Sequence, residues 1–479
     1  MNVLLAASEC VPFIKTGGLG DVVGALPKAL GHRKAEVSII LPKYEDIPSI
    51  KTKRMTFLKS LVVPVGWRKQ YCGIYYLKED GVTYYFLDNE YYFKRRGCYG
   101  YYDDGERFAF FSRAVLEALP HLSVRPPDII HCHDWQTGPI CALLKSHYFQ
   151  NQSFYQRIHT VFTIHNLQYQ GVFPRSALHD LLDLDEWFFQ ENGLEFYGNV
   201  SYMKAGLAFA DRLTTVSRAY AEEIQMPYYG EKLDGFLRWR SHDLHGIVNG
   251  IDQASYDPLT DAALVVPILD DRGKKKNKLN LQKQLRLTPD ESVPMIGMIT
   301  RLANQKGIDL VLRVFHEIAE QDAQFVLLGT GDQEYEQKFN QLAARYPKKV
   351  SCNLFFDESL ARKIYAASDL FLMPSKFEPC GIGQLLALRY GSLPIVRETG
   401  GLKDTVIPYN EYSDEGYGFT FTNYNAHDML YTIKRALNFY REDQAHWKKL
   451  VDRALRLDFG WDASAKAYSD LYQSLIEEQ

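Results

Sequence analysis

Short apolar runs alternate with amphipathic stretches along most of the chain. The apolar runs of the first half predict strands, and the stretches between them, such as 106–119 and 199–210, predict helices because their apolar residues recur every three or four positions. The predicted strands are 2–7, 36–41, 128–132, 158–164 and 212–216, with a hairpin at 73–78 and 82–88. Continuous apolar strands that alternate with helices are typical of a parallel sheet covered on both faces.

The alternation restarts after a loop-rich stretch at 226–260. The second set of predicted strands is 295–300, 324–328, 351–355, 370–373 and 393–396, with helices at 307–319, 334–345, 360–367 and 383–390. We therefore predict two doubly wound α/β domains, 1–245 and 246–457, that face one another across a cleft. Ligands of such sheets bind beyond the carboxyl ends of the strands. A last amphipathic helix is predicted at 463–476.

Composition and charge narrow the class of protein. The 479 residues carry 55 Lys and Arg against 59 Asp and Glu, a net charge of −4, which argues against a nucleic-acid partner. No apolar run approaches the roughly 20 residues that span a bilayer, and the N-terminus lacks the basic region of a signal peptide. The seven Cys follow no regular spacing, so neither a disulfide framework nor a metal site is indicated. We expect a cytoplasmic protein with no membrane partner.

A glycine-rich loop connects the first predicted strand to the first predicted helix. It reads Lys15-Thr16-Gly17-Gly18-Leu19-Gly20-Asp21. Glycines let the backbone approach a ligand, and the free N–H groups of a helix start attract anions. The loop therefore predicts a phosphate site, with a tight turn as the alternative. It matches neither the Walker A order nor the GxGxxG fingerprint.

Three further loops follow strands of the second half and begin helices. The first holds Arg301 and Lys306, two cations that suit a diphosphate. The second, 376–384, holds Glu378, and the third, 398–402, is another glycine turn. Each loop alone could be an ordinary turn, but three in one domain point together to a binding site.

These motifs resemble those of bacterial glycogen synthases and plant starch synthases. The shared segments are K-T-G-G-L-G-D from residue 15, H-C-H-D-W at 131–135, T-I-H-N at 163–166, V-N-G-I-D at 248–252, T-R-L-A-N-Q-K-G at 300–307, F-E-P-C-G at 377–381, T-G-G-L at 399–402 and F-G-W at 459–461. They run in order over nearly the whole chain. The resemblance implies a GT-B fold, in which the C-terminal segment 458–479 packs back on the N-terminal domain. It also implies retaining transfer of glucose from ADP-glucose to the non-reducing 4-hydroxyl of an α-1,4-glucan.

The resemblance also implies a role for each matching residue. The catalytic set is Lys15, His165, Arg301, Lys306 and Glu378. The donor-binding set is Gly17, Gly18, Asp21, Asn249, Phe356, Cys380, Gly381, Thr399, Gly400 and Gly401. Asp134, Trp135 and Asn166 would face the acceptor. Retaining GT-B enzymes often carry a second Glu seven or eight residues after the first, but positions 385 and 386 are Leu here, which favours transfer on one face of the sugar over double displacement.

Several alternatives stay open at this point. The donor could be UDP-glucose, since one aromatic ring at Phe356 stacks on either base, and the chain could be a non-catalytic glucan- or nucleotide-binding homologue. A dehydrogenase is disfavoured because the dinucleotide fingerprint is absent. No metal or other cofactor is expected: His131 and His133 share one face of a strand, but the sequence places no third ligand.

Two further segments are singled out by composition. Residues 91–102 interleave aromatic and basic side chains, Phe93 among them, and predict either an acceptor-glucan surface or local loop packing. The same pattern would suit single-stranded nucleic acid, which the net charge disfavours. The basic run from Lys274 to Lys278 is interpreted as a solvated helix start.

Overall fold

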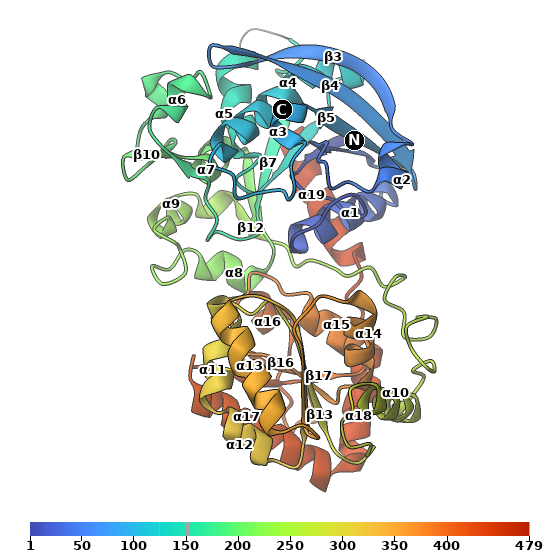
Figure 1. Ribbon diagram of the computed structural model, residues 1–479. Helices are drawn as coiled ribbons and strands as arrows, with labels where there is room; N and C mark the ends of the chain where they lie inside the picture. Colours follow the sequence, from blue (N-terminus) through green and yellow to red (C-terminus); the bar gives the residue numbers. More distant parts are fainter. Residues whose placement is uncertain (124, 150–152, 479) are drawn as a thin grey trace. The chain divides into compact units, whose positions relative to one another are not determined.

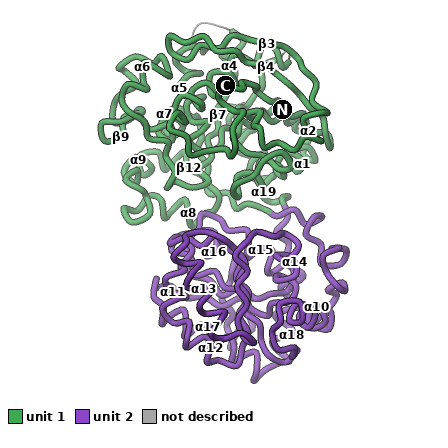
Figure 2. The backbone as a smooth tube through the Cα atoms, in the orientation of Figure 1, with its two compact units in different colours: residues 1–250, 461–479 green, residues 251–460 purple. Residues whose placement is uncertain are grey.

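The computed structural model describes residues 1–123, 125–149 and 153–478 (Figure 1). The chain forms two compact units, which are coloured separately in Figure 2. Unit 1 comprises residues 1–250 and 461–479, and unit 2 comprises residues 251–460. The division falls at 250/251 and 460/461, a few residues beyond the 245/246 and 457/458 expected from the sequence.

A nine-stranded sheet forms the centre of unit 1, in the order β12-β11-β7-β6-β1-β2-β5-β4-β3. Its strands are β1 (Asn2–Ala6), β2 (Glu36–Pro42), β3 (Thr56–Val65), β4 (Arg68–Glu79), β5 (Val82–Asp88), β6 (Ile129–His133), β7 (His159–Ile164), β11 (Arg212–Thr215) and β12 (Leu244–Gly246). The strands from β12 to β5 are parallel, and β4 pairs antiparallel with β5 and β3. The sequence did not predict β3, because its first residues are nearly all exposed and lack an apolar face.

The helices of unit 1 are α1 (Gly18–Gly31), α2 (Ser49–Thr52), α3 (Glu90–Phe93), α4 (Asp104–Leu122), α5 (Gly138–Leu143), α6 (Ala177–Asp180), α7 (Tyr202–Phe209), α8 (Arg218–Glu223), α9 (Asp234–Trp239) and α19 (Asp462–Glu477). A small sheet pairs β8 (Val172–Phe173), β10 (Asn199–Ser201) and β9 (Glu195–Phe196). A π-helical segment lies at Leu144–Tyr148, and 3₁₀ turns lie at Glu186–Phe188 and Ser241–Asp243.

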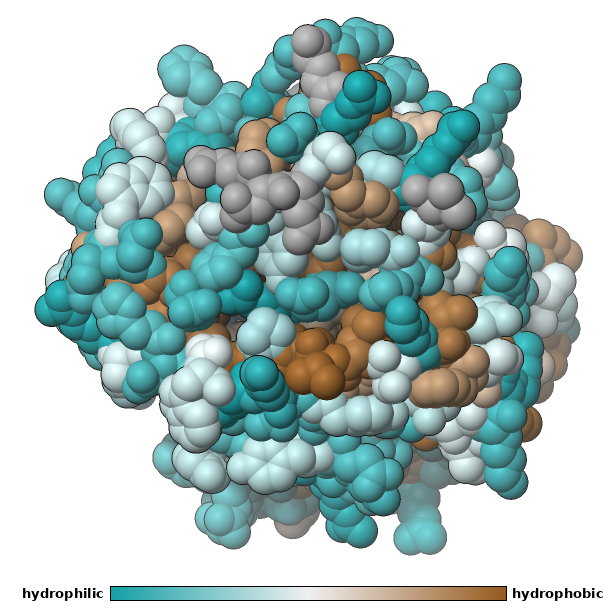
Figure 3. All heavy atoms as spheres, turned by 90° about the horizontal axis from the view of Figure 1, so that it is seen from above, coloured by the Kyte–Doolittle hydropathy of each residue, from teal (hydrophilic) through white to brown (hydrophobic). Residues whose placement is uncertain are grey.

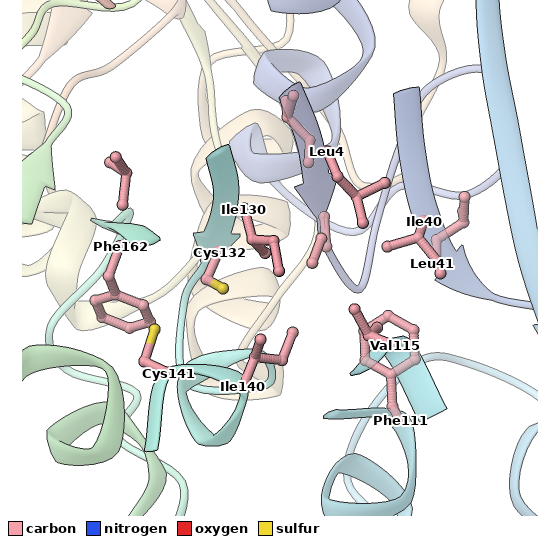
Figure 4. Close-up of a cluster of buried hydrophobic side chains, with 14 of the residues drawn as sticks. Leu4, Ile40, Leu41, Phe111, Val115, Ile130, Cys132, Ile140, Cys141 and Phe162 are labelled. Carbon is pink, nitrogen blue, oxygen red and sulfur yellow. The ribbon is translucent and has the colours of Figure 1, made fainter. Parts of the chain in front are cut away.

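The core of unit 1 lies on the sheet strands at its centre. Figure 4 shows Leu4 and Ile130, from neighbouring strands, with Val115 of α4 and Ile140 of α5 on the helical side. All four side chains are at most 2% exposed. Helix α19 packs against α1, and its Tyr472 hydroxyl lies 2.7 Å from Nδ1 of His131 on β6. The last helix of the chain is therefore part of the first unit.

Unit 2 contains a six-stranded, wholly parallel sheet in the order β15-β14-β13-β16-β17-β18. Its strands are β13 (Met295–Ile299), β14 (Gln324–Leu328), β15 (Val350–Asn353), β16 (Leu370–Met373), β17 (Leu393–Arg397) and β18 (Phe419–Phe421). Its helices are α10 (Asp271–Gln284), α11 (Ile308–Arg313), α12 (Phe315–Glu320), α13 (Gln333–Arg345), α14 (Glu358–Ala367), α15 (Gly383–Arg389), α16 (Gly400–Thr405), α17 (Ala426–Glu442) and α18 (Gln444–Leu455), with a turn at Asn304–Lys306. The five predicted strands are confirmed, and the helix predicted at 307–319 is two helices.

One expectation about unit 2 is wrong. The basic run at the start of α10 is not a solvated face, because Lys274 and Lys278 are 3% and 1% exposed. The Lys274 ammonium donates to the carbonyls of Ala366 and Tyr390, at 3.1 and 2.9 Å, and Lys278 pairs with Asp369 at 2.8 Å. Lys274 therefore fastens α10 to the ends of α14 and α15, and Lys278 fastens it to the residue before β16, so neither lysine faces water.

Both sheets contain a point at which the strand order reverses. β1 lies between β2 and β6 in unit 1, and β13 lies between β14 and β16 in unit 2. Adjacent loops diverge at such a point, which leaves room for a ligand beyond the carboxyl ends of the strands. The predicted glycine loop follows β1, and Arg301 follows β13.

Figure 3 shows one face of the molecule on which hydrophilic side chains predominate and hydrophobic ones form separate patches. Among the described residues, we find no helix with the length and hydrophobicity to cross a membrane.

Candidate functional site

The buried carboxylate of Glu9 organises the glycine loop of unit 1. Glu9 follows β1 and is 3% exposed. It accepts hydrogen bonds from the Thr16 N–H, from the Thr16 hydroxyl at 2.6 Å and from the Gly17 N–H at 3.1 Å. The Tyr99 hydroxyl donates to it at 2.6 Å. Four donors on one carboxylate fix the backbone of the loop.

The start of α1 remains open to a ligand beside this carboxylate. The cap residue Gly17 has no capping side chain, so Gly18 begins α1 with first-turn N–H groups that no side-chain cap satisfies. The Lys15 ammonium lies 2.7 Å from Asp21 on the same helix, which holds the cation beside the helix start. The Gly17 amide donates to Glu9, which leaves the Gly18 amide as the one predicted to contact a phosphate.

Asp134 follows β6, the strand next to β1. Its backbone is in the left-handed region, with φ +58°, which is costly for a residue other than glycine and concentrates at functional sites. Its carboxylate accepts from the His165 N–H at 2.7 Å. Burial raises the pKa of Asp134 to about 7, against the lowering effect of the hydrogen bonds from the His165 and Asn166 amides, and the nearby Glu9 raises it further. An acid with a pKa near neutrality suits proton transfer or the binding of a hydroxyl group.

Three imidazole rings lie together at the ends of β6 and β7. Nδ1 of His133 lies 2.9 Å from Nε2 of His165, and the rings of His131 and His133 are 4.1 Å apart. His131 is held by the hydroxyls of Tyr472 and Thr163, at 2.7 and 2.5 Å. Burial lowers the pKa of His131 and of His165 to about 3, so both rings are neutral at physiological pH.

Two amides complete the predicted site residues of unit 1. Asn249 is 6% exposed, and its side-chain oxygen is buried with no hydrogen-bond partner among the residues that the structure describes. An unsatisfied buried acceptor is costly and calls for an explanation such as a bound ligand. Asn166 uses its side-chain oxygen to cap the Gln168 N–H at 3.0 Å.

The aromatic residues expected on the acceptor side are mostly internal. Phe93 is fully buried and packs against Tyr44 and Phe110, so the expectation that it contacts a glucan is wrong. Trp135 is 8% exposed and packs edge-on against Phe108. Within 91–102, local packing is therefore the correct alternative for Phe93. Tyr99 of this segment donates its hydroxyl to Glu9, and for the exposed Tyr91 and Tyr102 an acceptor-glucan surface stays a prediction.

In unit 2, an ion pair links the loops on either side of the strand reversal. The Lys306 ammonium, from the loop after β13, lies 2.7 Å from the Glu378 carboxylate, from the loop after β16. Glu378 is 6% exposed and also accepts from the Ser375 hydroxyl at 3.0 Å. The Lys376 N–H donates to the Gln305 carbonyl at 2.8 Å and fastens the same two loops together.

Two glycines, Gly400 and Gly401, allow the loop after β17 to lie close to the backbone at Glu378 and Cys380. Gly400 has φ +44°, and a Cβ there would lie 2.0 Å from the Glu378 carbonyl. A Cβ on Gly401 would lie 2.0 Å from the Cys380 carbonyl, and its N–H donates to the Glu378 carbonyl at 3.0 Å. Thr399 is buried and provides no side-chain cap for α16. The two glycines thus have a packing reason to be there, which the sequence did not reveal.

The other predicted residues of unit 2 lie on loops of the same sheet. Cys380 is buried at the turn before α15, and Gly381 takes φ +74°. Arg301 is exposed on the loop after β13, and Phe356 is 80% exposed beyond β15. Both loops follow strands of one parallel sheet, so these side chains emerge at the same edge. Leu385 and Leu386 are buried in the core, which leaves no carboxylate at those positions.

Sequence reasoning missed Glu9. A lone Glu between a strand and a glycine loop carries no motif, and only the fold shows that it faces the loop. Among the described residues, no group of three or more His, Cys, Asp or Glu side chains is arranged to hold a metal ion.

The comparisons with known proteins agree with this geometry. The family described as "Starch synthase catalytic domain" matches residues 2–239, and "Glycosyl transferases group 1" matches residues 282–451. The glycogen synthase of Alkaliphilus metalliredigens is 56% identical over 477 residues, which cover 99% of this chain and all of that protein. The glycogen synthase of Geobacillus stearothermophilus is 55% identical over 481 residues, which cover all of this chain and 99% of that protein.

Two solved structures are similar. The catalytic domain of starch synthase IV from Arabidopsis thaliana, bound to ADP and acarbose, superposes with a TM-score of 0.92 at 36% identity and covers 99% of each chain. Sucrose-phosphate synthase from Thermosynechococcus elongatus, at 18% identity, covers both chains fully with a TM-score of 0.62 and supports the fold alone. Fold and site together define a glycosyltransferase of the GT-B class. The chain belongs to the glycogen and starch synthase family.

Proposed function

We propose that this glycosyltransferase moves glucose from ADP-glucose to the non-reducing 4-hydroxyl of an α-1,4-glucan, with retention of the α configuration. The observation that carries the proposal is the Lys306–Glu378 pair at the strand reversal of unit 2. It combines a cation for a diphosphate with a carboxylate that can accept from sugar hydroxyls. The ADP in the structure of the starch synthase relative favours an adenine nucleotide as donor.

Unit 2 would bind the donor. Arg301 and Lys306 neutralise the diphosphate as the glycosidic bond breaks and negative charge collects on the leaving group. Glu378 holds the glucose ring by its hydroxyls, and the N–H groups that follow Cys380 approach the phosphates or the sugar. The exposed ring of Phe356 stacks on the base. No metal or other cofactor enters this scheme.

Unit 1 would provide the acceptor side. Burial lowers the pKa of His165 to about 3, so its ring binds a sugar oxygen as an uncharged group. Lys15, held by Asp21, adds positive charge beside the open start of α1. Asp134 accepts from an acceptor hydroxyl, and the unsatisfied oxygen of Asn249 accepts from a glucose hydroxyl.

The transfer follows a front-face course. The bond from the anomeric carbon to the leaving phosphate breaks, and the acceptor oxygen bonds to that carbon on the same face. The acceptor proton passes to the departing phosphate oxygen. The absence of a second carboxylate at the buried Leu385 and Leu386 favours this course over a covalent glucosyl-enzyme.

One assay tests the proposal. The purified protein is incubated with glycogen and radiolabelled ADP-glucose or UDP-glucose, and label is counted in precipitated glucan. Label from ADP-glucose that an α-1,4-specific exo-acting phosphorylase releases as α-glucose 1-phosphate supports donor, linkage and retention. Preferential use of UDP-glucose overturns the donor assignment, and no incorporation from either donor overturns the enzyme assignment.

A further inference from the structure

Two turns of unit 2, at 378–381 and 399–401, contain residues that are expected to bind the donor, and we call them the donor turns. The helices that follow them, α15 and α16, lie side by side (Figure 1). Gln384, on α15, is fully buried. We propose that Gln384 is a positioning residue for the donor, because its amide fixes the backbone of both donor turns in the arrangement that binds the nucleotide sugar. This inference rests on the proposed function.

The amide nitrogen of Gln384 holds the first donor turn directly. Its Nε2 donates to the carbonyls of Cys380 and Gly381, at 3.1 and 3.0 Å. Because a peptide group is planar and trans, its N–H points away from its carbonyl. The two contacts therefore direct the N–H groups of Gly381 and Ile382 away from Gln384. These are the N–H groups that the proposed function assigns to the phosphates or the sugar.

The second donor turn is held through Thr405, the last residue of α16. The Thr405 side chain is buried, and its hydroxyl donates to the Gly401 carbonyl at 2.5 Å. A hydroxyl has one proton to donate, so its oxygen accepts from Nε2 of Gln384, at 3.0 Å. The Gly401 N–H donates in turn to the Glu378 carbonyl at 3.0 Å. One continuous set of hydrogen bonds therefore joins the two donor turns.

The oxygen of the Gln384 amide has no comparable contact. Oε1 is buried without a hydrogen-bond partner among the residues that the structure describes. A buried acceptor that lacks a donor lowers the stability of the folded state. A Cβ at Gly381 would lie 2.5 Å from Oε1, so only glycine leaves room for the amide at that position. The side chain of Gln384 thus lies where its nitrogen contacts the turns, although this leaves its oxygen unsatisfied.

A change at Gln384 should alter binding of the donor and leave binding of the acceptor unaffected. Both donor turns belong to unit 2, whereas the residues assigned to the acceptor belong to unit 1. A displacement of about 1 Å in the groups that hold a substrate can cost about 10²-fold in rate. A small movement of the turns is therefore enough to weaken the donor complex.

A matched glutamine separates positioning from stability. Gln282, on α10 of the same unit, is also fully buried. Its Nε2 donates to the Asp290 carbonyl at 2.8 Å and to Oε1 of Gln324 at 2.9 Å. None of these three residues is expected to bind the donor. A change from glutamine to glutamate at either position keeps the size of the side chain, removes the NH₂ donor and buries a carboxylate, so both changes should lower Tm.

The test compares Gln384→Glu with Gln282→Glu, and Thr405→Val with Thr405→Ser. Valine has the shape of threonine without its hydroxyl, and serine keeps the hydroxyl. Titration calorimetry with ADP measures the Kd of each full-length protein, and steady-state assays measure KM for ADP-glucose and for glycogen. Circular dichroism melts measure Tm and show whether each variant is folded at the assay temperature.

We expect Gln384→Glu and Thr405→Val to raise the Kd for ADP and the KM for ADP-glucose about tenfold, with the KM for glycogen unchanged. Thr405→Ser should keep the Kd within about twofold, and Gln282→Glu should lower Tm with the Kd unchanged.

An unchanged Kd in Gln384→Glu overturns the proposal, as does an equal rise of the Kd in Gln282→Glu, which would show a general effect of lost stability. If Gln384→Glu does not fold, an equal Kd in Thr405→Val and Thr405→Ser overturns it. Failure of the unchanged protein to transfer glucose, while it binds ADP more tightly than Gln384→Glu does, would overturn the proposed function and leave Gln384 as a positioning residue of a nucleotide site.

Discussion

Nδ1 of His133 lies 2.9 Å from Nε2 of His165, and the other ring nitrogen of His133 is buried with no partner in the described part of the chain. A buried N–H without an acceptor is rarer than a buried acceptor without a donor. The proton of His133 is therefore on Nδ1, where it is donated to His165. The proton of His165 must then be on Nδ1, so the second ring nitrogen of His165 is an N–H donor.

Nitrogen-15 NMR of histidine-labelled protein tests this assignment. The Nε2 signal of His165 should have the shift of an unprotonated nitrogen and stay constant from about pH 5.5 to 8.5, because the pKa of the ring is lowered to about 3. His165→Asn identifies the signal. A protonated Nε2, or a titration within that range, contradicts the prediction.

The Lys306–Glu378 pair should be essential for turnover. Lys306→Ala or Glu378→Ala is expected to lower kcat by about 10²–10³, the usual loss when a charged group that stabilises the transition state is removed. Steady-state assays with saturating ADP-glucose and glycogen measure the effect. Lys338→Ala is the control, since it removes an exposed pair with Glu334 in the same unit. Near-normal kcat in either site variant would show that the pair is only structural.

Glu9 should act by positioning the glycine loop. In Glu9→Gln, a side-chain NH₂ group faces N–H and O–H donors whose hydrogen bonds the carboxylate accepts. The loop then loses its fixed backbone, and we expect kcat/KM for ADP-glucose to fall about tenfold or more. Tyr99→Phe, which removes one of the four hydrogen bonds, should cause a smaller fall. The exposed Glu36→Gln is the control. An unchanged kcat/KM in Glu9→Gln refutes the role.

The ionised carboxylate of Asp134 should lower the stability of the folded protein and be required for activity. Its pKa is raised to about 7 from a usual value of 3.8, so its contribution to stability is complete below about pH 4 and is lost as the pH rises through 7. Asp134→Asn cannot ionise, and its Tm at pH 8 should exceed that of the unchanged protein by about 2–4 °C, with activity greatly reduced. Calorimetry at pH 4 and pH 8 measures the difference. A Tm difference that does not grow between these pH values would contradict the prediction.

The contribution of Lys274 to the free energy of unfolding should depend on pH in the opposite direction to that of Asp134. Burial lowers its pKa from 10.5 to about 7, so the folded state loses the proton first and the free energy of unfolding rises between about pH 7 and pH 10. In Lys274→Met that part of the rise disappears. Urea unfolding of both proteins at several pH values isolates it as the difference between the two curves. Lys276→Met, on the same helix, is the control, and a constant difference would show that Lys274 stays charged.

The fold could be predicted further than the site. The strands at the centre of both sheets are buried on two faces, so their apolar runs were recognisable, whereas β3 is mostly exposed and was missed. Motifs located the loops that follow β1, β13 and β16. They could not show that the Gly17 amide is occupied by Glu9, or that Lys306 and Glu378 form a pair, because those contacts depend on the spacing of strands far apart in the sequence. The prediction for Lys274 was wrong because a run of lysines usually lies on a solvent-exposed face.

Helix α19 belongs to unit 1 but is the last element to leave the ribosome, so unit 1 cannot be completed before unit 2 has been synthesised. Residues 251–460 emerge after most of unit 1 and before its last helix, so unit 2 can complete its own core while the first unit still lacks α19. Until then His131 has no Tyr472 hydroxyl, and the apolar face that receives the helix is open to solvent. A nascent chain that stops short of residue 461 therefore holds a finished second unit beside an unfinished first one, a state that chaperones and proteases can recognise by its exposed apolar surface.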